Sequence, residues 1–256
     1  MLCESVGVRP ISRLTGLDQK TILRILESAG EHCASFLDAK VRNLNARVIQ
    51  ADEVHSIVGC RQQNALPDET ERGEQFTYLG VDRHSKLIIN WLVGKRTREN
   101  AAEFLTDLKN RMASGFQLTT DNWKIYSGMM GAVQAVFGNE VDYAVETKYF
   151  AKPDTFLPRR LIGLRRHRRI GNPDMKLATT CHAERTNLSV RTFTRRFTRC
   201  TLGYSKTLQN HRYAVALFVA HFNFCRIHSA HGRTPAQAAG LTDHAWTVAE
   251  LMSATI

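Results

Sequence analysis

Hydrophobic residues recur at helical spacing at the start of the chain. Residues 8–16 carry apolar side chains three apart, and residues 18–30 place four apolar side chains on one helical face. Asp18 is a suitable N-cap for the second helix, and Gly30 is a suitable C-terminal stop. The segment 15–17, Thr-Gly-Leu, is typical of a tight turn. The pattern therefore predicts two short helices joined by a turn.

Alternating apolar and polar positions follow, and they predict strands rather than helices. Three strands are expected to form a meander, at 47–58, 76–82 and 86–94. The next segments predict a helix, a strand, a second helix and a fifth strand, at 97–114, 116–120, to about 137, and 141–147.

The last third of the chain predicts a loop and then long helices. Residues 152–176 are rich in Pro, Gly and Arg and predict a loop, and helices are expected at 181–199 and 209–226. The order is βββαβαβ followed by helices, which predicts an α/β mixed sheet with helices on its faces. We expect a helical segment at 1–42, a sheet domain at 43–230 and a C-terminal tail at 231–256.

The composition is that of an ordinary folded protein. The chain has 256 residues, of which 43% are hydrophobic and 23% charged. No apolar run approaches the roughly 20 residues that span a bilayer, and Met1–Glu4 lacks the features of a signal peptide. Six cysteines without a Cys-x-x-Cys spacing predict reduced thiols rather than a zinc ribbon or a disulfide framework. We therefore expect a cytoplasmic protein.

The positive charge is concentrated in one quarter of the chain. The net charge is +11, and residues 148–212 contain 16 Lys and Arg but three acids. The rest of the chain contains 19 basic and 21 acidic residues, from 35 less 16 and 24 less 3. A solvated basic face is one interpretation. A phosphate-binding region is the favoured one, because so one-sided a segment repels itself without counter-charge.

The N-terminal helices also match the helix-turn-helix pattern of DNA-binding proteins. In that motif the first residues of the second helix reach the major groove. The candidates here are Gln19, Lys20 and Arg24. A helical hairpin without DNA-binding function gives the same pattern, so both interpretations stay open.

Three acidic residues have positions that matter for chemistry. Asp52 lies in the middle of the first strand, Asp121 ends the fourth, and Glu184 opens the late helix. The element order is that of an RNase H-like fold, in which the first and fourth strands are neighbours. Converging carboxylates suit hard divalent cations. Asp121 alone is equally well explained as a helix N-cap, and a chain with 24 acids always contains some Asp-Asp-Glu triple.

Four sequence blocks resemble the insertion-sequence-one-like branch of bacterial DDE transposases. They are "IQADEVHSIVG", "TTDNWKIYSG", "HAERTNLSVRTFTRRFTRCTLGYSK" and "FNFCRIHSAHGRTPAQAAGLTDHAWTVAELM", which together cover about Val48 to Met252. The resemblance implies Asp52, Asp121 and Glu184 as the catalytic metal-binding triad. It also implies two Mg²⁺ (or Mn²⁺) ions and strand cleavage and transfer at transposon ends.

The resemblance extends to partners. It implies double-stranded DNA, both transposon ends and target, bound by a homodimer or higher oligomer. Full-length relatives begin with more helix and often a zinc module, so a short form, a wrongly placed start and a truncated copy all fit residues 1–42. The alternative function is an inactive remnant that only binds DNA, and a nuclease that does not transpose is a third.

Several neighbours of the triad have candidate roles. Arg191 lies two helical turns after Glu184, where related enzymes often carry Lys or Arg, and it could bind a phosphate near the cut. His182 and Asn187 flank Glu184 and could contact the phosphate or orient the Glu184 carboxylate. Further DNA-binding candidates are basic residues of the loop and late helix: Arg165, Arg166, Arg168, Arg169, Arg195, Arg196 and Arg199.

Two other acids are expected to lie outside the triad. Glu53 follows Asp52 in the strand, so its side chain should point to the opposite face of the sheet. Asp82 is interpreted as a turn residue between the second and third strands rather than as a further ligand.

Overall fold

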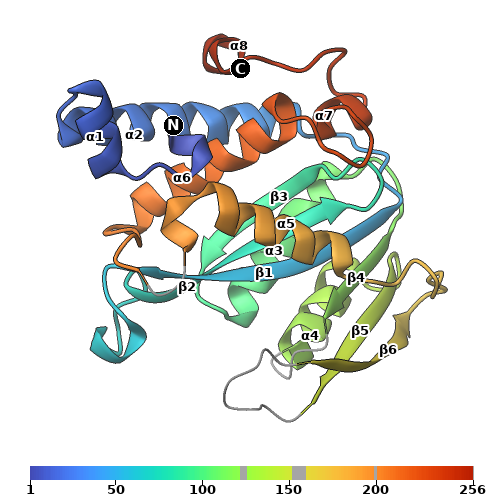
Figure 1. Cartoon of the computed structure of the whole chain (residues 1–256). Helices are drawn as coiled ribbons and strands as arrows, with labels where there is room; N and C mark the ends of the chain where they lie inside the picture. The colour runs from blue at the N-terminus through green and yellow to red at the C-terminus, as the bar shows by residue number, and fades with distance from the viewer. Residues whose placement is uncertain (122–125, 152–159, 199–200, 256) are drawn as a thin grey trace.

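A single mixed sheet forms the centre of the protein (Figure 1). The computed structural model describes residues 1–121, 126–151, 160–198 and 201–255. Residues 126–130 are described by their backbone alone. Within these residues the sheet has six strands in the order β3-β2-β1-β4-β5-β6. Their bounds are β1 (Val48–Val58), β2 (Gly73–Asp82), β3 (Ile88–Gly94), β4 (Gln117–Asp121), β5 (Asp142–Phe150) and β6 (Leu161–Ile170).

The strand directions confirm the expected fold class. β1, β2 and β3 form an antiparallel meander, and β4 runs parallel to β1 with β5 parallel to β4. The first and fourth strands are therefore neighbours, as an RNase H-like α/β fold requires. β6 adds an antiparallel strand at the edge beyond β5.

Helices cover both faces of the sheet. The helices α3 (Arg98–Arg111) and α4 (Tyr126–Phe137) pack together on one face. On that side, a Cβ at Gly80 would lie 2.4 Å from Asn90 Oδ1, and Phe104 and Leu108 of α3 pack nearby at 3.5 Å. The helix α5 (Cys181–Phe193) lies on the other face, where its first backbone N–H groups donate to Gln50 of β1. The two faces therefore carry alternate residues of β1.

The N-terminal helices α1 (Val8–Thr15) and α2 (Gln19–Lys40) flank a left-handed turn at Gly16. Asp18 caps α2 as expected, because its Oδ1 accepts from the backbone N–H of Lys20 at 2.8 Å. The predicted end at Gly30 is wrong, since α2 continues for ten more residues. A Cβ at residue 30 would lie 2.4 Å from the Cβ of Tyr213, so glycine here allows a close helix crossing rather than a helix stop.

The partner of α2 in this crossing is α6 (Leu208–Ala220), which continues into a π-turn at His221–Cys225. The buried face of α2, including Leu26, Phe36 and Leu37, belongs to the same hydrophobic core as the strands. The C-terminal helices α7 (Pro235–Ala238) and α8 (Val248–Ser253) close this end, where Leu251 is fully buried. Short 3-10 turns occur at Leu2–Glu4, Gln62–Asn64 and Arg195–Phe197.

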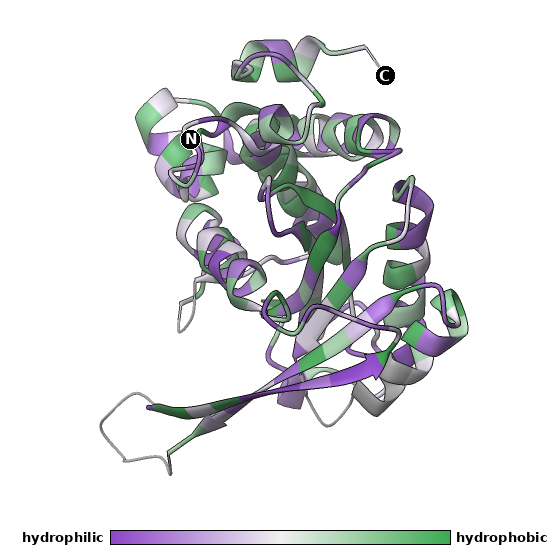
Figure 2. Cartoon of the chain, turned by 90° about the vertical axis from the view of Figure 1, so that its right-hand side faces the viewer, coloured by the Kyte–Doolittle hydropathy of each residue, from purple (hydrophilic) through white to green (hydrophobic). Residues whose placement is uncertain are grey.

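The predicted loop at 152–176 is wrong in part, because it contains β6. Both faces of β6 are exposed along most of its length, so its sequence has no alternation of apolar and polar positions to reveal a strand. Backbone pairing with β5 holds it instead. Figure 2 shows β5 and β6 extending from the body as a two-stranded arm.

The late helix is also shorter than predicted. α5 ends at Phe193, and Thr194 is buried with extended backbone (φ −123°, ψ 104°). The chain then makes the turn Arg195–Phe197. The side chain of Arg196 donates to Ser205 Oγ at 3.1 Å, so it follows its own packing rather than the helix face.

A buried amide fastens the outer edge of the sheet. Asn223, in the π-turn after α6, accepts from the Ile88 N–H at 3.0 Å and donates to its C=O at 2.8 Å. Both residues are buried. The Asn223 amide thus pairs with backbone groups of β3 on the edge where no further strand follows.

Candidate active site

The two aspartates of the predicted triad lie on neighbouring strands and on one face of the sheet. β1 and β4 pair as Val48 with Gln117 through Gln50 with Thr119. Continued along the strands, the same register brings Asp52 opposite Asp121. Residues in parallel register point to the same face, and Gln50 shows that this is the face covered by α5. The predicted adjacency of the two strands is confirmed.

Asp52 is held firmly and in a place that disfavours its charge. Its Oδ1 accepts from the backbone N–H of Glu53 at 2.9 Å, and its Oδ2 accepts from Asn187 Nδ2 at 2.8 Å. Burial, followed by the nearby carboxylates of Glu53 and Asp121, raises the pKa of Asp52 to about 7. Such a carboxylate gains from a cation placed beside it. Asn187 therefore orients the carboxylate of Asp52, whereas the expected partner was the carboxylate of Glu184.

The sheet positions the first turn of α5. Gln50 Oε1 accepts from the N–H groups of His182 and Ala183 at 2.8 and 3.2 Å. Glu146 Oε2 accepts from the backbone N–H of Thr180 at 3.1 Å and lies 3.1 Å from its hydroxyl oxygen. These acceptors satisfy the free N–H groups that every helix start presents. They bring Glu184, in the same turn, over the face that carries Asp52 and Asp121.

The carboxylate of Glu184 is bound by Thr180 and by Lys148 of β5. Its Oε1 accepts from Thr180 Oγ1 at 2.6 Å and forms an ion pair with the ammonium of Lys148. Among the residues that the structure describes, no three His, Cys, Asp or Glu side chains stand close enough to hold a metal ion. The triad as a metal-binding set thus stays a prediction.

The chemistry of the donors nevertheless fits a hard divalent cation. Asp52, Asp121 and Glu184 offer only oxygen atoms, the ligands that Mg²⁺ prefers. The Lys148 ammonium already places a positive charge on Glu184 and lowers the pKa of Asp52. These carboxylates therefore attract a cation, and in this structure the cation beside them is the Lys148 ammonium.

Glu146 is a fourth carboxylate at this site, and its role was not predicted from the sequence. It pairs with Asp121 in the β4–β5 register, and its side chain is 2% exposed. Burial raises its pKa, but hydrogen bonds from Thr180 and Arg166 outweigh that effect and hold the pKa below its usual range. Only the pairing of β4 with β5 reveals its place, since nothing in its own segment marks it.

The other acids behave as expected. Glu53 lies on the opposite face, where Arg96 donates to its Oε2 at 2.8 Å. Asp82 is a turn residue, because its Oδ2 accepts from the backbone N–H of Ser85 at 2.8 Å and from the Ser85 hydroxyl. Residues 122–125, which follow Asp121, lie outside the described residues, so the N-cap interpretation is not tested.

The candidate DNA-binding residues occupy three regions. Gln19, Lys20 and Arg24 are exposed at the start of α2. Four arginines are exposed on β6, at Arg165, Arg166, Arg168 and Arg169, in the arm beside the carboxylates. In the third region Arg191 is half-buried in α5, Arg195 is exposed, Arg196 bonds Ser205, and Arg199 lies outside the described residues.

A second basic cluster lies beside the start of α5, and sequence reasoning missed it. Lys86 Nζ lies 3.5 Å from His182 Nε2, although the two residues are 96 apart in sequence. Burial, then Lys86 and Arg83, lowers the pKa of His182 to about 4. His228 is also near, and its pKa is lowered by burial and then by its basic neighbours. Basic groups crowded in this way favour an anionic ligand.

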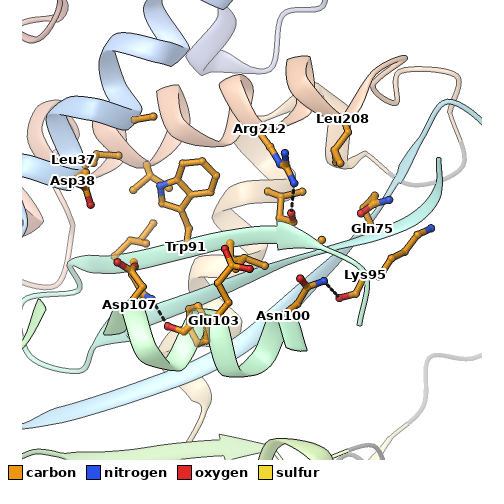
Figure 3. A pocket seen from close by; sticks show the side chains of 18 of the residues that line it. Leu37, Asp38, Gln75, Trp91, Lys95, Asn100, Glu103, Asp107, Leu208 and Arg212 are labelled. Atoms are coloured by element: carbon orange, nitrogen blue, oxygen red, sulfur yellow. Dashed lines mark hydrogen bonds between the residues drawn. The ribbon is translucent and has the colours of Figure 1, made fainter. Parts of the chain in front are cut away.

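One sizeable cavity lies away from the carboxylates. It has a volume of about 770 Å³ and borders the outer strand β3, between α2, α3 and α6. Figure 3 shows Trp91 of β3 in its wall, with Glu103 and Asp107 on α3 and Arg212 on α6. The triad residues are absent from its lining, so this cavity is not the candidate active site.

Comparison with known proteins adds a remote resemblance. No family model matches the chain, and no curated protein matches it. One similar solved structure is an intasome of simian T-cell lymphotropic virus in complex with the PP2A regulatory subunit B56 gamma. It has a TM-score of 0.45 and 15% identity over 91% of this chain and 70% of that chain.

Two further similar structures are Mos1 complexes. The Mos1 strand transfer complex has a TM-score of 0.25 and 10% identity, over 55% of this chain and 52% of that chain. The Mos1 transposase paired-end complex with the left transposon end has a TM-score of 0.24 and 11% identity, over 55% and 53%. At these values the resemblance carries no argument, and the function has to be argued from the site.

In the described part of the chain, none of the helices combines the length and the apolar character that crossing a bilayer requires.

Proposed function

We propose that the protein is a DNA transposase that cleaves and joins DNA strands with the help of divalent metal ions. The supporting observation is the placement of Asp52 and Asp121 on neighbouring parallel strands, under a helix that carries Glu184. Carboxylates arranged in this way serve phosphoryl transfer between nucleic-acid strands. Within that class, the sequence blocks favour the insertion-sequence-one-like branch.

In this proposal each part of the site has a separate task. Asp52, Asp121 and Glu184 would hold two Mg²⁺ or Mn²⁺ ions, which activate an attacking oxygen and stabilise the leaving one. Asn187 fixes the Asp52 carboxylate. Gln50 and Glu146 hold the first turn of α5 in place.

Basic side chains flank the carboxylates on two sides and would bind the DNA backbone. The β6 arm supplies exposed arginines on one side, and Lys86 with His182 lies at the start of α5 on the other. Arginine suits this role because its planar fork matches two phosphate oxygens. A duplex of double-stranded DNA between these two regions would pass over the face that carries Asp52.

The test is strand cleavage and joining by the purified chain. The substrate is a supercoiled plasmid that carries the gene with its flanking DNA, incubated with Mg²⁺ or Mn²⁺. Asp121→Asn should reduce nicked and joined products by more than about 100-fold, since even outer-shell partners of a metal contribute 10–100-fold. Glu140→Gln, an exposed carboxylate paired with Lys109, is the matched control and should keep full activity.

A DNA-binding protein without catalysis is the second candidate, and the ion pair between Glu184 and Lys148 favours it. Fluorescence anisotropy in EDTA should show equal DNA binding by the wild type and by Asp121→Asn under either hypothesis. Full activity of Asp121→Asn would refute the triad. DNA binding without metal-dependent products from the wild type would support the second candidate instead.

A further inference from the structure

Lys148 lies among the carboxylates of the candidate active site. Asp121 pairs with Glu146 in the β4–β5 register, and Lys148 follows two residues later, so its side chain points to the same face. The ammonium forms an ion pair with Glu184 Oε1. The Lys148 side chain is 21% exposed and that of Glu184 42%, so this pair is only partly in solvent.

The charge of Lys148 acts on more than Glu184. It also lowers the pKa of Asp52, on β1, and that of Glu146, on its own strand. One ammonium therefore serves carboxylates from three elements. A divalent ion bound to Asp52, Asp121 and Glu184 would do the same, and a positive charge beside it would be repelled.

We propose that Lys148 is a built-in counter-ion that competes with the divalent metal for Glu184. In the metal-free protein the ammonium of Lys148, on β5, holds the carboxylate of Glu184, on α5. Metal binding requires that this ion pair opens. The inference rests on the proposed function, because it assumes that Glu184 is a metal ligand. Lys148 is a positioning residue, since it acts through Glu184.

When the Glu184 carboxylate moves away from Thr180, the Thr180 hydroxyl keeps a hydrogen-bond acceptor. The Thr180 hydroxyl has a single proton, yet two carboxylate oxygens lie within reach, Glu184 Oε1 at 2.6 Å and Glu146 Oε2 at 3.1 Å. The proton serves one of them at a time. When Glu184 turns to a metal, the hydroxyl donates to Glu146, and no buried donor is left unsatisfied.

The first experiment measures Mn²⁺ affinity by electron paramagnetic resonance of the free ion. Lys148→Met removes the charge and keeps most of the volume. The Kd for Mn²⁺ should fall by about tenfold or more, because a unit charge within about 4–6 Å of a carboxylate shifts its binding equilibrium by that amount. Lys148→Arg keeps the charge and should bind as the wild type does. Lys109→Met, which removes a lysine paired with Glu140, should also leave the Kd unchanged.

The second experiment uses the wild type alone, so it does not depend on the folding of a variant. Lysines are acetylated briefly with and without Mn²⁺, and each site is quantified by mass spectrometry. Labelling of Lys148 should rise severalfold when Mn²⁺ binds, because the ion pair opens. Labelling of Lys109 should not change.

The outcomes separate this inference from the proposed function. If the wild type binds Mn²⁺, and Asp121→Asn abolishes that binding, the metal site stands. An unchanged or weaker affinity in Lys148→Met, or constant labelling of Lys148, then overturns the role of Lys148 alone. If neither the wild type nor Lys148→Met binds Mn²⁺, the metal site fails, and the competition fails with it.

Discussion

Replacing Asp52 by asparagine should stabilise the metal-free protein at neutral and alkaline pH. The pKa of Asp52 is raised from 3.8 to about 7, with burial as the first cause and the carboxylates of Glu53 and Asp121 next. At 1.36 kcal/mol per pH unit, this difference corresponds to about 4 kcal/mol. Asparagine has nearly the same shape and no charge to bury.

The sign follows from the direction of the pKa change. A carboxyl whose folded pKa lies above its unfolded pKa favours folding at low pH, and this contribution is lost as the pH rises from about 4 to about 7. Asp52→Asn has no carboxyl at this position, so its free energy of unfolding does not fall for this reason as the pH rises. The free energy of unfolding of Asp52→Asn should therefore match that of the wild type near pH 4 and exceed it by up to about 4 kcal/mol at pH 8.

The hydrogen bonds of the site tolerate the change. Asp52 accepts from Glu53 N–H and from Asn187 Nδ2. An asparagine keeps the first bond through its oxygen and can donate its amide to Asn187 Oδ1, a buried atom without another partner in the structure. This requires only that the Asn187 amide turns over.

The assay is urea denaturation in EDTA at pH 4, 6 and 8, with the free energy of unfolding extrapolated to water. Asp68→Asn is the control, because it replaces an exposed carboxylate outside the candidate site. A flat difference for Asp52→Asn, or a variant less stable than the wild type at pH 8, would refute the reasoning.

Two further predictions concern packing. Gly30→Ala should lower the free energy of unfolding by about 2 kcal/mol: its Cβ would meet Tyr213 at 2.4 Å, and overpacking outweighs the ~1 kcal/mol of improved helix propensity. Thermal denaturation checks this, and Gly115→Ala, with nothing within 4 Å, should not share the loss. Asn223→Ala should cost about 2–4 kcal/mol in urea denaturation, because it leaves the buried N–H and C=O of Ile88 unpaired. Wild-type stability in either variant would contradict its explanation.

The sequence predicts the elements that have one buried face. β1 alternates between buried and more exposed positions in its second half and β2 in its first half, so both follow from the pattern. β4 is a short run of mixed apolar and polar residues that is buried up to its last position. The order then places Asp52 and Asp121 on neighbouring strands. Local turn chemistry was predictable as well, as Asp18 and Asp82 show.

The remaining features depend on contacts between distant segments. β6 buries little of either face, so its strand state depends on pairing with β5 and leaves no periodic signal. Gly30 is ambiguous by itself, because a helix stop and a close helix crossing both favour glycine. Lys148 and Glu146 enter the site through the β4–β5 register and through the side-chain conformation of Glu184, which the sequence does not encode locally.

The shared register of β1 and β4 has a consequence for how this gene can vary. One residue inserted or deleted within Val48–Asp52, or within Gln117–Asp121, would reverse the face on which its aspartate lies. Point substitutions in these strands change single side chains, whereas insertion of one codon would place the two aspartates on opposite faces of the sheet. Length variation should therefore be tolerated between the strands, as at 59–72, and excluded within them.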